Sequence, residues 1–414
     1  MSDQTDNATL QTILSTGESP AGLFGKDTVA SHIVESYEFL RTKLREDLTK
    51  DPFKRLGIWA DFLTNRVYFA VFIHPDDSLA YQVYEVINTR GKELTTADLL
   101  KNYVLSQTPN SQRPARYRQW KAISRQFSED SAAFVQYIRH VVTVESGHIL
   151  PKDLFGFLAG RVTHFGRKPP STPQLMALLE RHLPLYLQMM DPTLPGPAEQ
   201  EALKIFSALN SLNVIAVRPI LLALADVPRS LQGMNYVLRL VLRRIAVGGL
   251  GTGNVERRFG ESAKGVQQEH TWKVLESELR DLNPTRDDFV EQVKKRSFTK
   301  VVLAFLRRSI ITSSITPEEF GVLHYIRPRQ ASDWRGMSEE DGANLGSTIG
   351  NTFLSTLERR PREASNWRGF KEYMLPYAAP HEWRKKLERV EEWNADAVER
   401  IGSKLAEAAG DIWY

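Results

Sequence analysis

Hydrophobic residues recur every three or four positions along most of this chain, which is the pattern of amphipathic helices. The pattern begins at residue 29, after a polar start, and predicts a long helix to residue 48. Its apolar positions are Ile33, Tyr37, Leu40 and Leu44. Pro52 suits the first turn of a second helix, which we expect over residues 53–63.

Residues 66–73 interrupt this helical spacing. The segment is rich in aromatic and β-branched residues and predicts a short buried strand. Helical spacing returns at residues 80–86 and again from about residue 97 to residue 106. We expect the second of these helices to end at a linker over residues 108–114, which contains two prolines.

The middle of the chain, up to residue 225, shows helical segments separated by prolines at spacings too irregular for a repeat architecture. These segments predict a helical bundle. A further helix over residues 231–247 is followed by the glycine-rich segment 248–253. Because this segment has no preceding strand and lacks the lysine and hydroxyl residues of a phosphate loop, we predict a helix stop and no nucleotide site in this chain by itself.

Residues 88–103 combine a polar glycine turn with the start of a helix. Gly91 allows a tight turn, and Thr95 or Thr96 can accept a backbone N–H of the helix that follows. Asp98 places a negative charge in the positive first turn. On these grounds alone, the stretch is equally consistent with an ordinary joint between two helices.

The composition is that of a globular protein with an ordinary core. Hydrophobic residues make up 42% and charged residues 25% of the 414 positions, and the net charge of +4 is too small to demand a polyanionic partner. The absence of cysteine excludes disulfides and thiolate metal sites, so any metal ion would use oxygen or imidazole ligands. We expect a cytoplasmic protein without a membrane partner, because no apolar run approaches the roughly 20 residues of a membrane span.

The run N-T-R-G-K-E-L-T-T-A-D-L-L-K-N resembles the signature of the GmrSD family, which comprises type IV restriction enzymes that attack modified DNA. The signature positions are Asn88, Thr89, Arg90, Gly91, Asp98, Lys101 and Asn102. In that family a ParB-like nucleotide-handling half with an Asp-Gly-Gln-Gln-Arg motif precedes the signature. The motif does not occur in this sequence, so we expect the ParB-like half to be missing or to be a separate partner subunit.

The last third of the chain is similar to the HNH-like nuclease domain of the same family. The resemblance is carried by residues 322–328, Trp334, residues 347–351, residues 365–371 and the closing helix from Trp393 to Trp413. It implies a small ββα metal nuclease, in which an acidic residue and an asparagine or histidine hold one cation and a histidine activates water. By resemblance the candidate catalytic residues are His324, Tyr325, Asn351, Asn366 and Lys371.

This nuclease motif is degenerate. An ungapped alignment puts His324 at the position of the metal-binding glutamate, Tyr325 at the general base and Ser347 at a second family histidine. A tyrosine, with an ordinary pKa of about 10, makes a poor base at neutral pH. A shift by one residue restores His324 as base but puts Leu323 at the carboxylate position, where it cannot bind a cation. If cleavage remains, Mg²⁺ or Mn²⁺ would be held by His324 and Asn366; alternatively, His324 is a hydrogen-bonded core residue.

Two groups of basic residues are candidates for DNA contact. The first lies around the nuclease-like loop and contains Arg359, Arg360, Arg362 and Arg368; the second, nearer the middle, contains Arg116, Arg118 and Lys121. Cations of this kind bind phosphates. Together with Arg113 and Arg125, those of the second group alternate along the chain with Tyr117, Trp120 and Phe127, whose rings can pack or stack on bases. The alternative for the second group is a solvated helix face over buried aromatic residues.

These observations predict a mainly α-helical protein: a helical bundle with a short strand element, followed by a small ββα HNH-like domain. We expect a remnant of the GmrS-like domain at residues 1–108, a helical middle at 109–225 and a GmrD-like region at 226–414 with its degenerate HNH module at about 318–414. The expected function is DNA-targeting restriction or phage defence with weak or absent cleavage, which leaves open whether the chain is an active endonuclease. The alternative is a non-catalytic docking or regulatory subunit for a separate ParB-like partner.

Overall fold

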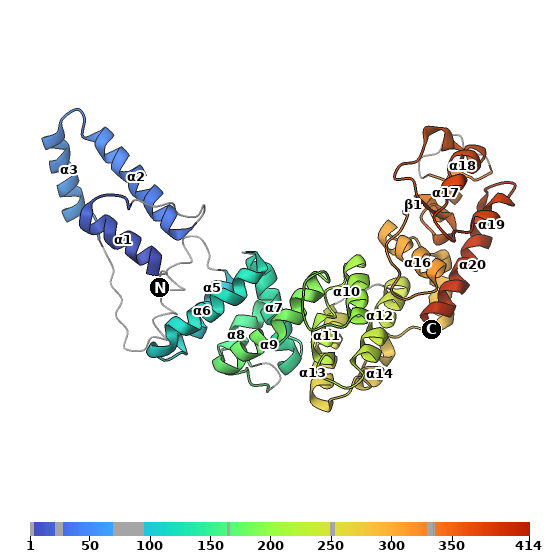
Figure 1. Cartoon of the computed structure of the whole chain (residues 1–414), viewed down its shortest axis with the longest axis horizontal. Coiled ribbons are helices and arrows are strands. Elements are labelled where there is room, and N and C mark those ends of the chain that lie inside the picture. The colour runs from blue at the N-terminus through green and yellow to red at the C-terminus, as the bar shows by residue number, and fades with distance from the viewer. Residues whose placement is uncertain are drawn as a thin grey trace. The chain divides into compact units, whose positions relative to one another are not determined.

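The computed structural model describes residues 4–20, 28–68, 95–128, 130–163, 166–248, 253–328, 334 and 336–414. The contacts of the chain divide it into two compact units, Met1–Pro75 and Asp76–Tyr414 (Figure 1). Within the described residues both units are mainly helical, and the strands form one two-stranded sheet. The prediction of a mainly helical chain is therefore confirmed. The sheet pairs residues 322–325 with residues 352–355 and does not contain the short strand predicted at residues 66–73. The boundaries at residues 108 and 225 stay predictions.

The first unit contains the helices α1 (Gln4–Thr16), α2 (Val29–Asp47) and α3 (Pro52–Asn65). The second and third agree with the predicted helices. Asp51 caps α3, and Pro52 occupies its first turn. Of the predicted strand, residues 66–68 form no strand and the other five lie outside the described residues.

Helix α3 is tied to the end of α2 by polar contacts. Asp47 pairs with Arg55, whose Nε lies 2.9 Å from Oδ2, and accepts a hydrogen bond of 2.9 Å from the indole of Trp59. Beyond these contacts α3 buries none of its residues. Its apolar side chains are exposed, Phe53 at 90% and Leu63 at 59%.

The second unit begins with a series of helices. They are α5 (Thr96–Ser106), α6 (Arg113–Ser124), α7 (Ser131–Ser146), α8 (Leu154–Leu158), α9 (Thr172–Met190), α10 (Gln200–Ser211), α11 (Arg218–Leu224), α12 (Ser230–Val247), α13 (Gly253–Glu269), α14 (Val274–Glu278), α15 (Arg286–Lys295) and α16 (Lys300–Thr312). Polar side chains accept the free amide hydrogens at several helix starts, as at Thr95, Asp130, Thr285 and Thr299.

The local predictions for these helices are largely confirmed. The signature helix begins at Thr96 with Thr95 as its cap, and α12 ends at Gly248. The predicted helix at 80–86, signature residues 88–94 and glycine segment residues 249–252 lie outside the described residues. The linker prediction is wrong at its end, because Pro114 occupies the first turn of α6, where its missing N–H costs no helical hydrogen bond.

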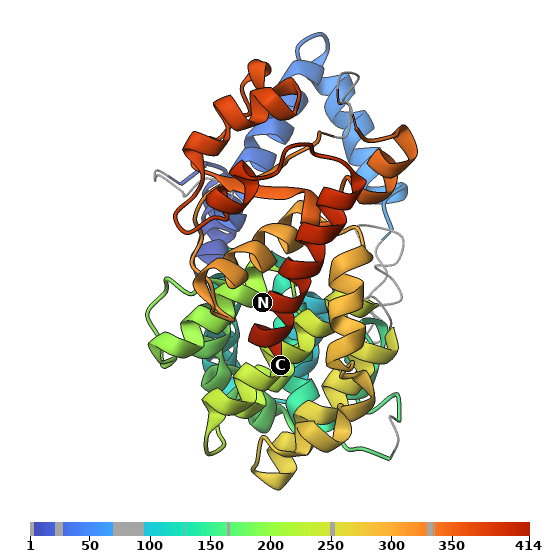
Figure 2. The same ribbon diagram turned by 90° about the vertical axis from the view of Figure 1, so that its right-hand side faces the viewer.

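One hydrophobic core runs through this unit. Helix α13 packs against α7 and α11, and α9 also contacts α7 and α11. Helix α20 (Ala395–Trp413) packs against α15 and α16 (Figure 2). The buried apolar residues from Leu100 to Trp413 therefore form one cluster.

The C-terminal elements include the antiparallel strands β1 (Val322–Tyr325) and β2 (Thr352–Ser355), in which His324 is opposite Phe353. The helices here are α17 (Glu339–Leu345), α18 (Trp367–Tyr373), α19 (Arg384–Glu388) and α20. The order β1, β2, α18 is compatible with a ββα unit. Its identification with the HNH fold stays a prediction.

Short 3₁₀ helices connect many of these elements: Asn110–Gln112, Arg125–Phe127, Pro151–Asp153, Arg280–Leu282, Ile349–Asn351, Arg362–Ser365 and Leu375–Tyr377. The 3₁₀ helix Ile349–Asn351 leads directly into β2. In the part of the chain that the structure describes, no helix combines the length and the apolar character that crossing a membrane requires.

Candidate functional site

A pocket of about 540 Å³ lies beside β1. His324 and Tyr325 of β1 line it together with Lys300 at the start of α16 and Arg360 from the segment after β2. Phe298, Thr299 and Pro328 complete its described lining. The pocket thus brings two cations and a histidine together, and no carboxylate is among these lining residues.

The His324 ring is half-buried and held in one orientation. Its Nε2 lies 2.9 Å from the carbonyl oxygen of Leu357. Because a carbonyl oxygen can only accept, Nε2 of the neutral ring carries the proton and the lone pair lies on Nδ1. Burial lowers the pKa of His324, and the positive charges of Lys300 and Arg360 lower it further. The hydrogen bond to Leu357 raises this pKa, but its effect is smaller than that of burial. The ring is therefore a neutral acceptor at pH 7.

Arg360 is a structural cation as well as a wall of the pocket. Its Nη1 donates to the carbonyl oxygens of Tyr325 at 2.7 Å and Ile326 at 2.9 Å, and its Nε donates to that of Ala364 at 2.7 Å. Burial lowers the pKa of Arg360 to about 10, so it stays charged at neutral pH. Arg360 thus joins the end of β1 to the segment before α18, and most of its donors are already used.

Lys300 was not predicted from the sequence. Its ammonium lies 5.5 Å from the centre of the Tyr325 ring, a distance at which a cation is attracted to the ring face. Thr299 caps α16 and thereby fixes the position of the first helical residue, Lys300. No motif marks this lysine, because it reaches the pocket through the packing of α16 against β1.

Asn351 is buried and fully hydrogen-bonded. Its Oδ1 accepts from the backbone N–H of Arg327 at 2.9 Å and from the indole of Trp393 at 3.1 Å. Its Nδ2 donates to the carbonyl oxygens of Arg327 at 2.9 Å and Gly346 at 3.0 Å. These four bonds use the acceptor and donor capacity of the amide. In this arrangement Asn351 stabilises the core and has no polar atom left for a metal ion or a substrate.

Gly350, the neighbour of Asn351 in the motif, also has a packing role. A Cβ atom at this position would collide with the carbonyl oxygen of Val398 in α20. The absence of a side chain lets the turn before β2 approach the backbone of α20 closely. The Gly-Asn pair is therefore explained by packing and hydrogen bonding.

The other two motif residues lie at helix ends. Asn366 is exposed and caps α18, its Oδ1 accepting from the N–H of Gly369 at 2.9 Å. Lys371 lies 5.0 Å from the centre of the Trp367 ring, and its Nζ is 3.4 Å from the carbonyl oxygen of Glu388. Neither Asn366 nor Lys371 is among the described residues that line the pocket at His324.

The residues around His324 do not fit a divalent cation. Mg²⁺ and Mn²⁺ prefer carboxylate and carbonyl oxygens, whereas the charged groups that line this pocket are Lys300 and Arg360. Among the described residues, no group of three or more histidine and acidic side chains is arranged to hold a metal ion. Leu323, at the carboxylate position of the shifted alignment, points into the core and is 6% exposed.

The exposed arginines that follow β2 differ from Arg360. Arg359, Arg362 and Arg368 are all exposed. They lie within ten residues of one another in the chain: Arg359 precedes the 3₁₀ helix Arg362–Ser365, Arg362 begins it, and Arg368 is in the first turn of α18. Of the four arginines predicted to contact DNA here, these three are accessible.

The second basic group lies on α6. Arg118 is exposed, Arg116 donates to Gln119, and Lys121 is half-buried. Of the aromatic residues predicted to accompany them, Tyr117 is half-buried, whereas Trp120 and Phe127 belong to the core: Trp120 packs edge-on against Phe134, and Phe127 stacks on Tyr137. Because the rings of Trp120 and Phe127 are buried, they cannot stack on bases. The second basic group therefore fits the alternative interpretation, a solvated helix face that covers buried aromatic residues, better than a base-stacking surface.

The described part of the family signature forms a capped helix. Asp98 accepts a hydrogen bond from Thr95 and pairs with Lys101 at 2.9 Å, while Asn102 is half-buried. Asn88, Thr89, Arg90 and Gly91 lie outside the described residues. Of the signature, the structure therefore describes the helix start alone.

No protein-family model matches this chain, and no curated protein matches it. The resemblance to the GmrSD family therefore rests on the short motifs quoted above.

Proposed function

We propose that this chain is a DNA-targeting protein of the GmrSD class of restriction and phage-defence proteins, which binds DNA with weak or absent metal-dependent cleavage. The observation that carries the proposal is the pocket at β1, where Lys300 and Arg360 flank His324 without a carboxylate among the described lining residues. Such a pocket favours a phosphate oxygen and disfavours a metal cation.

The surroundings of the pocket support contact with a phosphate backbone. Arg359 and Arg362 are close in sequence to Arg360, one residue before it and two residues after it. The side chains of Arg359 and Arg362 are exposed. Each cation that neutralises a phosphate releases condensed counterions, so several such contacts give an affinity that falls steeply with salt. Because these contacts carry no base readout, we expect little sequence preference from this surface.

We expect weak cleavage because of the contacts that the predicted catalytic residues make in the structure. His324 has the fixed tautomer that a general base needs, with its lone pair on Nδ1. A base alone does not stabilise the charge that develops on the attacked phosphate, and Asn351 and Asn366 are occupied by hydrogen bonds within the fold. Cleavage would thus depend on Lys300 and Arg360 as the cationic groups.

The DNA proposal is tested by fluorescence anisotropy with a labelled duplex over a series of salt concentrations. The double variant Arg359→Gln, Arg362→Gln should weaken binding, and the slope of log K against log salt should fall by about 1 for each lost phosphate contact. Arg400→Gln, an exposed arginine on α20, is the matched control. Absence of binding by the unmodified protein at low salt would contradict the proposal.

Cleavage is measured separately. Purified protein is incubated with modified and unmodified phage DNA, with and without Mg²⁺, Mn²⁺ and nucleotide, and nicking of supercoiled DNA is scored. We expect little nicking and expect His324→Ala to remove what remains. Efficient cleavage that survives His324→Ala would show that the reacting groups lie elsewhere.

The second candidate function is a docking subunit for a separate ParB-like partner. The observation in its favour is the exposed apolar surface of α3, on which Phe53, Leu56 and Leu63 are at least half exposed. Contiguous exposed apolar residues commonly mark a protein-binding surface. Purified ParB-like protein should bind the chain and lose affinity at least tenfold when Phe53 and Leu63 are replaced by serine. An unchanged affinity would show that the ParB-like partner does not bind at the apolar surface of α3.

A further inference from the structure

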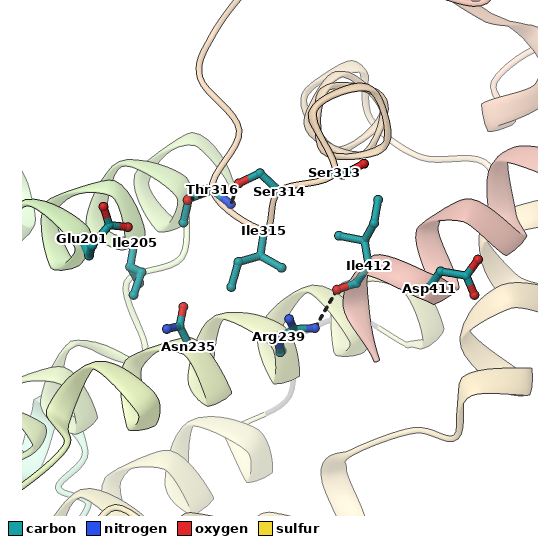
Figure 3. A pocket seen from close by; sticks show the side chains of 10 residues that line it. All are labelled: Glu201, Ile205, Asn235, Arg239, Ser313, Ser314, Ile315, Thr316, Asp411 and Ile412. Carbon is teal, nitrogen blue, oxygen red and sulfur yellow. Dashed lines mark hydrogen bonds between the residues drawn. The ribbon is translucent and has the colours of Figure 1, made fainter.

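A second pocket, which shares no lining residue with the β1 site, lies at the junction of α10, α12, the turn 313–316 and the end of α20 (Figure 3). Its volume is about 630 Å³, enough for a small organic molecule. Ile205 and Ile315 supply apolar wall, and the other lining residues are mainly polar.

Arg239 of α12 is the cation of this pocket. Its Nη1 donates to the carbonyl oxygen of Ile412 at 2.6 Å, as Figure 3 shows. In the described part of the chain no carboxylate pairs with Arg239. Burial lowers the pKa of Arg239, which shows that the guanidinium is partly withdrawn from water. A half-buried guanidinium with unused donors and no counter-charge attracts an anion.

The two acids at the rim are already paired with other cations. Asp411 lies 2.6 Å from Arg286, and Glu201 lies 2.7 Å from Lys204. Neither of these cations is among the lining residues. Arg239 is therefore the charge of the pocket that lacks a partner.

Neutral polar side chains line the same pocket as this charge. Asn235 lies one helical turn before Arg239, so both side chains leave the same face of α12, toward the turn 313–316 (Figure 3). Ser314 and Thr316 bring hydroxyl groups from that turn, where Ser314 Oγ accepts from the N–H of Thr316 at 3.1 Å. Amide and hydroxyl groups beside a guanidinium suit a carboxylate or phosphate oxygen.

We propose that this pocket binds a small organic anion, whose carboxylate or phosphate group pairs with Arg239 and Asn235 while its apolar body packs against Ile205 and Ile315. The site is independent of the proposed DNA-binding pocket, so either can fail alone.

The first test uses the full chain and needs no variant. Phenylglyoxal modifies accessible arginines, and peptide mass mapping gives the rate at each one. Phenyl phosphate or benzoate at millimolar concentration should slow the modification of Arg239 at least threefold while leaving the exposed Arg389 unchanged. The uncharged analogue phenol should protect neither arginine. Equal rates at Arg239 with and without both anions would overturn the proposal.

Titration calorimetry with the same anions tests the assignment of groups. Arg239→Gln should weaken binding at least tenfold, and Arg239→Lys, which keeps the charge, should weaken it less. Asn235→Leu does not remove either partner of the Arg239–Ile412 hydrogen bond, which joins α12 to α20. This variant should weaken binding several-fold, and such a loss of affinity would not be explained by the loss of that structural contact. Arg389→Gln is the control; binding unaffected by both Arg239→Gln and Asn235→Leu would place the ligand elsewhere.

Discussion

Replacing Asn351 with alanine should destabilise the C-terminal elements far more than replacing Asn366, although both residues match the same nuclease motif. Asn351 makes four hydrogen bonds in a fully buried position, and each contributes about 1 kcal/mol net. The expected loss is therefore about 4 kcal/mol, because the partners are left unpaired in the core. Asn366→Ala removes one exposed helix cap and should cost about 1 kcal/mol.

The measurement is urea unfolding of the full chain, with hydrogen exchange of the β1 and β2 amides to report on the C-terminal elements. Asn351→Ala should lower the unfolding midpoint clearly and accelerate exchange in both strands, whereas Asn366→Ala should have a small effect. An unfolding midpoint that is unchanged in Asn351→Ala would refute the reasoning, since it would mean that the four hydrogen bonds contribute nothing to stability.

Asn351→Asp separates the structural role from a metal-binding role. It keeps the shape but places a carboxylate oxygen against the carbonyl oxygens of Arg327 and Gly346, which now receive hydrogen bonds. We expect a loss of stability at neutral pH comparable with that of the alanine variant. If Asn351 were instead a cation ligand, aspartate would retain or improve Mg²⁺-dependent stabilisation, and the thermal midpoint would rise with added Mg²⁺.

The remaining predictions concern three other buried features. Arg360→Lys keeps the charge but loses the planar guanidinium that donates to the carbonyl oxygens of Tyr325, Ile326 and Ala364. Thermal unfolding should therefore show a free energy of unfolding lower by about 2 kcal/mol; an unchanged stability would contradict the structural role of Arg360. Gly350→Ala should cost about 1–3 kcal/mol in urea unfolding because its methyl group meets the α20 backbone, and Gly57→Ala, where space is open, is the control. Burial lowers the pKa of His140 well below its usual value, so the unfolded chain binds a proton first as the pH falls. Stability is then complete above about pH 6.5 and is lost below it by up to about 1.4 kcal/mol per pH unit; His140→Gln should flatten this slope between pH 7 and 5.

The features that sequence reasoning captured are local ones. The starts of α3 and α5 follow from Pro52 and Thr95, because the preference of proline for a first turn and the capping of a helix depend on groups within a few residues. The error at Pro114 is also local, since a proline can either end a helix or begin one, and the sequence offers both interpretations.

The candidate site was harder to predict because its groups meet through tertiary packing. Asn351 and Asn366 look alike in a motif, and what distinguishes them is Trp393, which is 42 residues from Asn351. Lys300 belongs to a helix that precedes the motif altogether. Arg360 was predicted to contact DNA, but its hydrogen bonds to three carbonyl oxygens become visible only when β1 and the segment before α18 are brought together.

The packing of α20 decides how this protein can be dissected. Helix α20 contacts the 3₁₀ helix Ile349–Asn351 and α17, and it also contacts α15 and α16. A recombinant fragment that starts at residue 318, the expected beginning of the nuclease-like module, would lack both α15 and α16. It would uncover the side of α20 that carries Trp413, whose ring packs 6.0 Å from that of Phe305 in α16. The module should therefore be expressed together with residues 286–312, and aggregation of the shorter fragment would say nothing about its affinity for DNA.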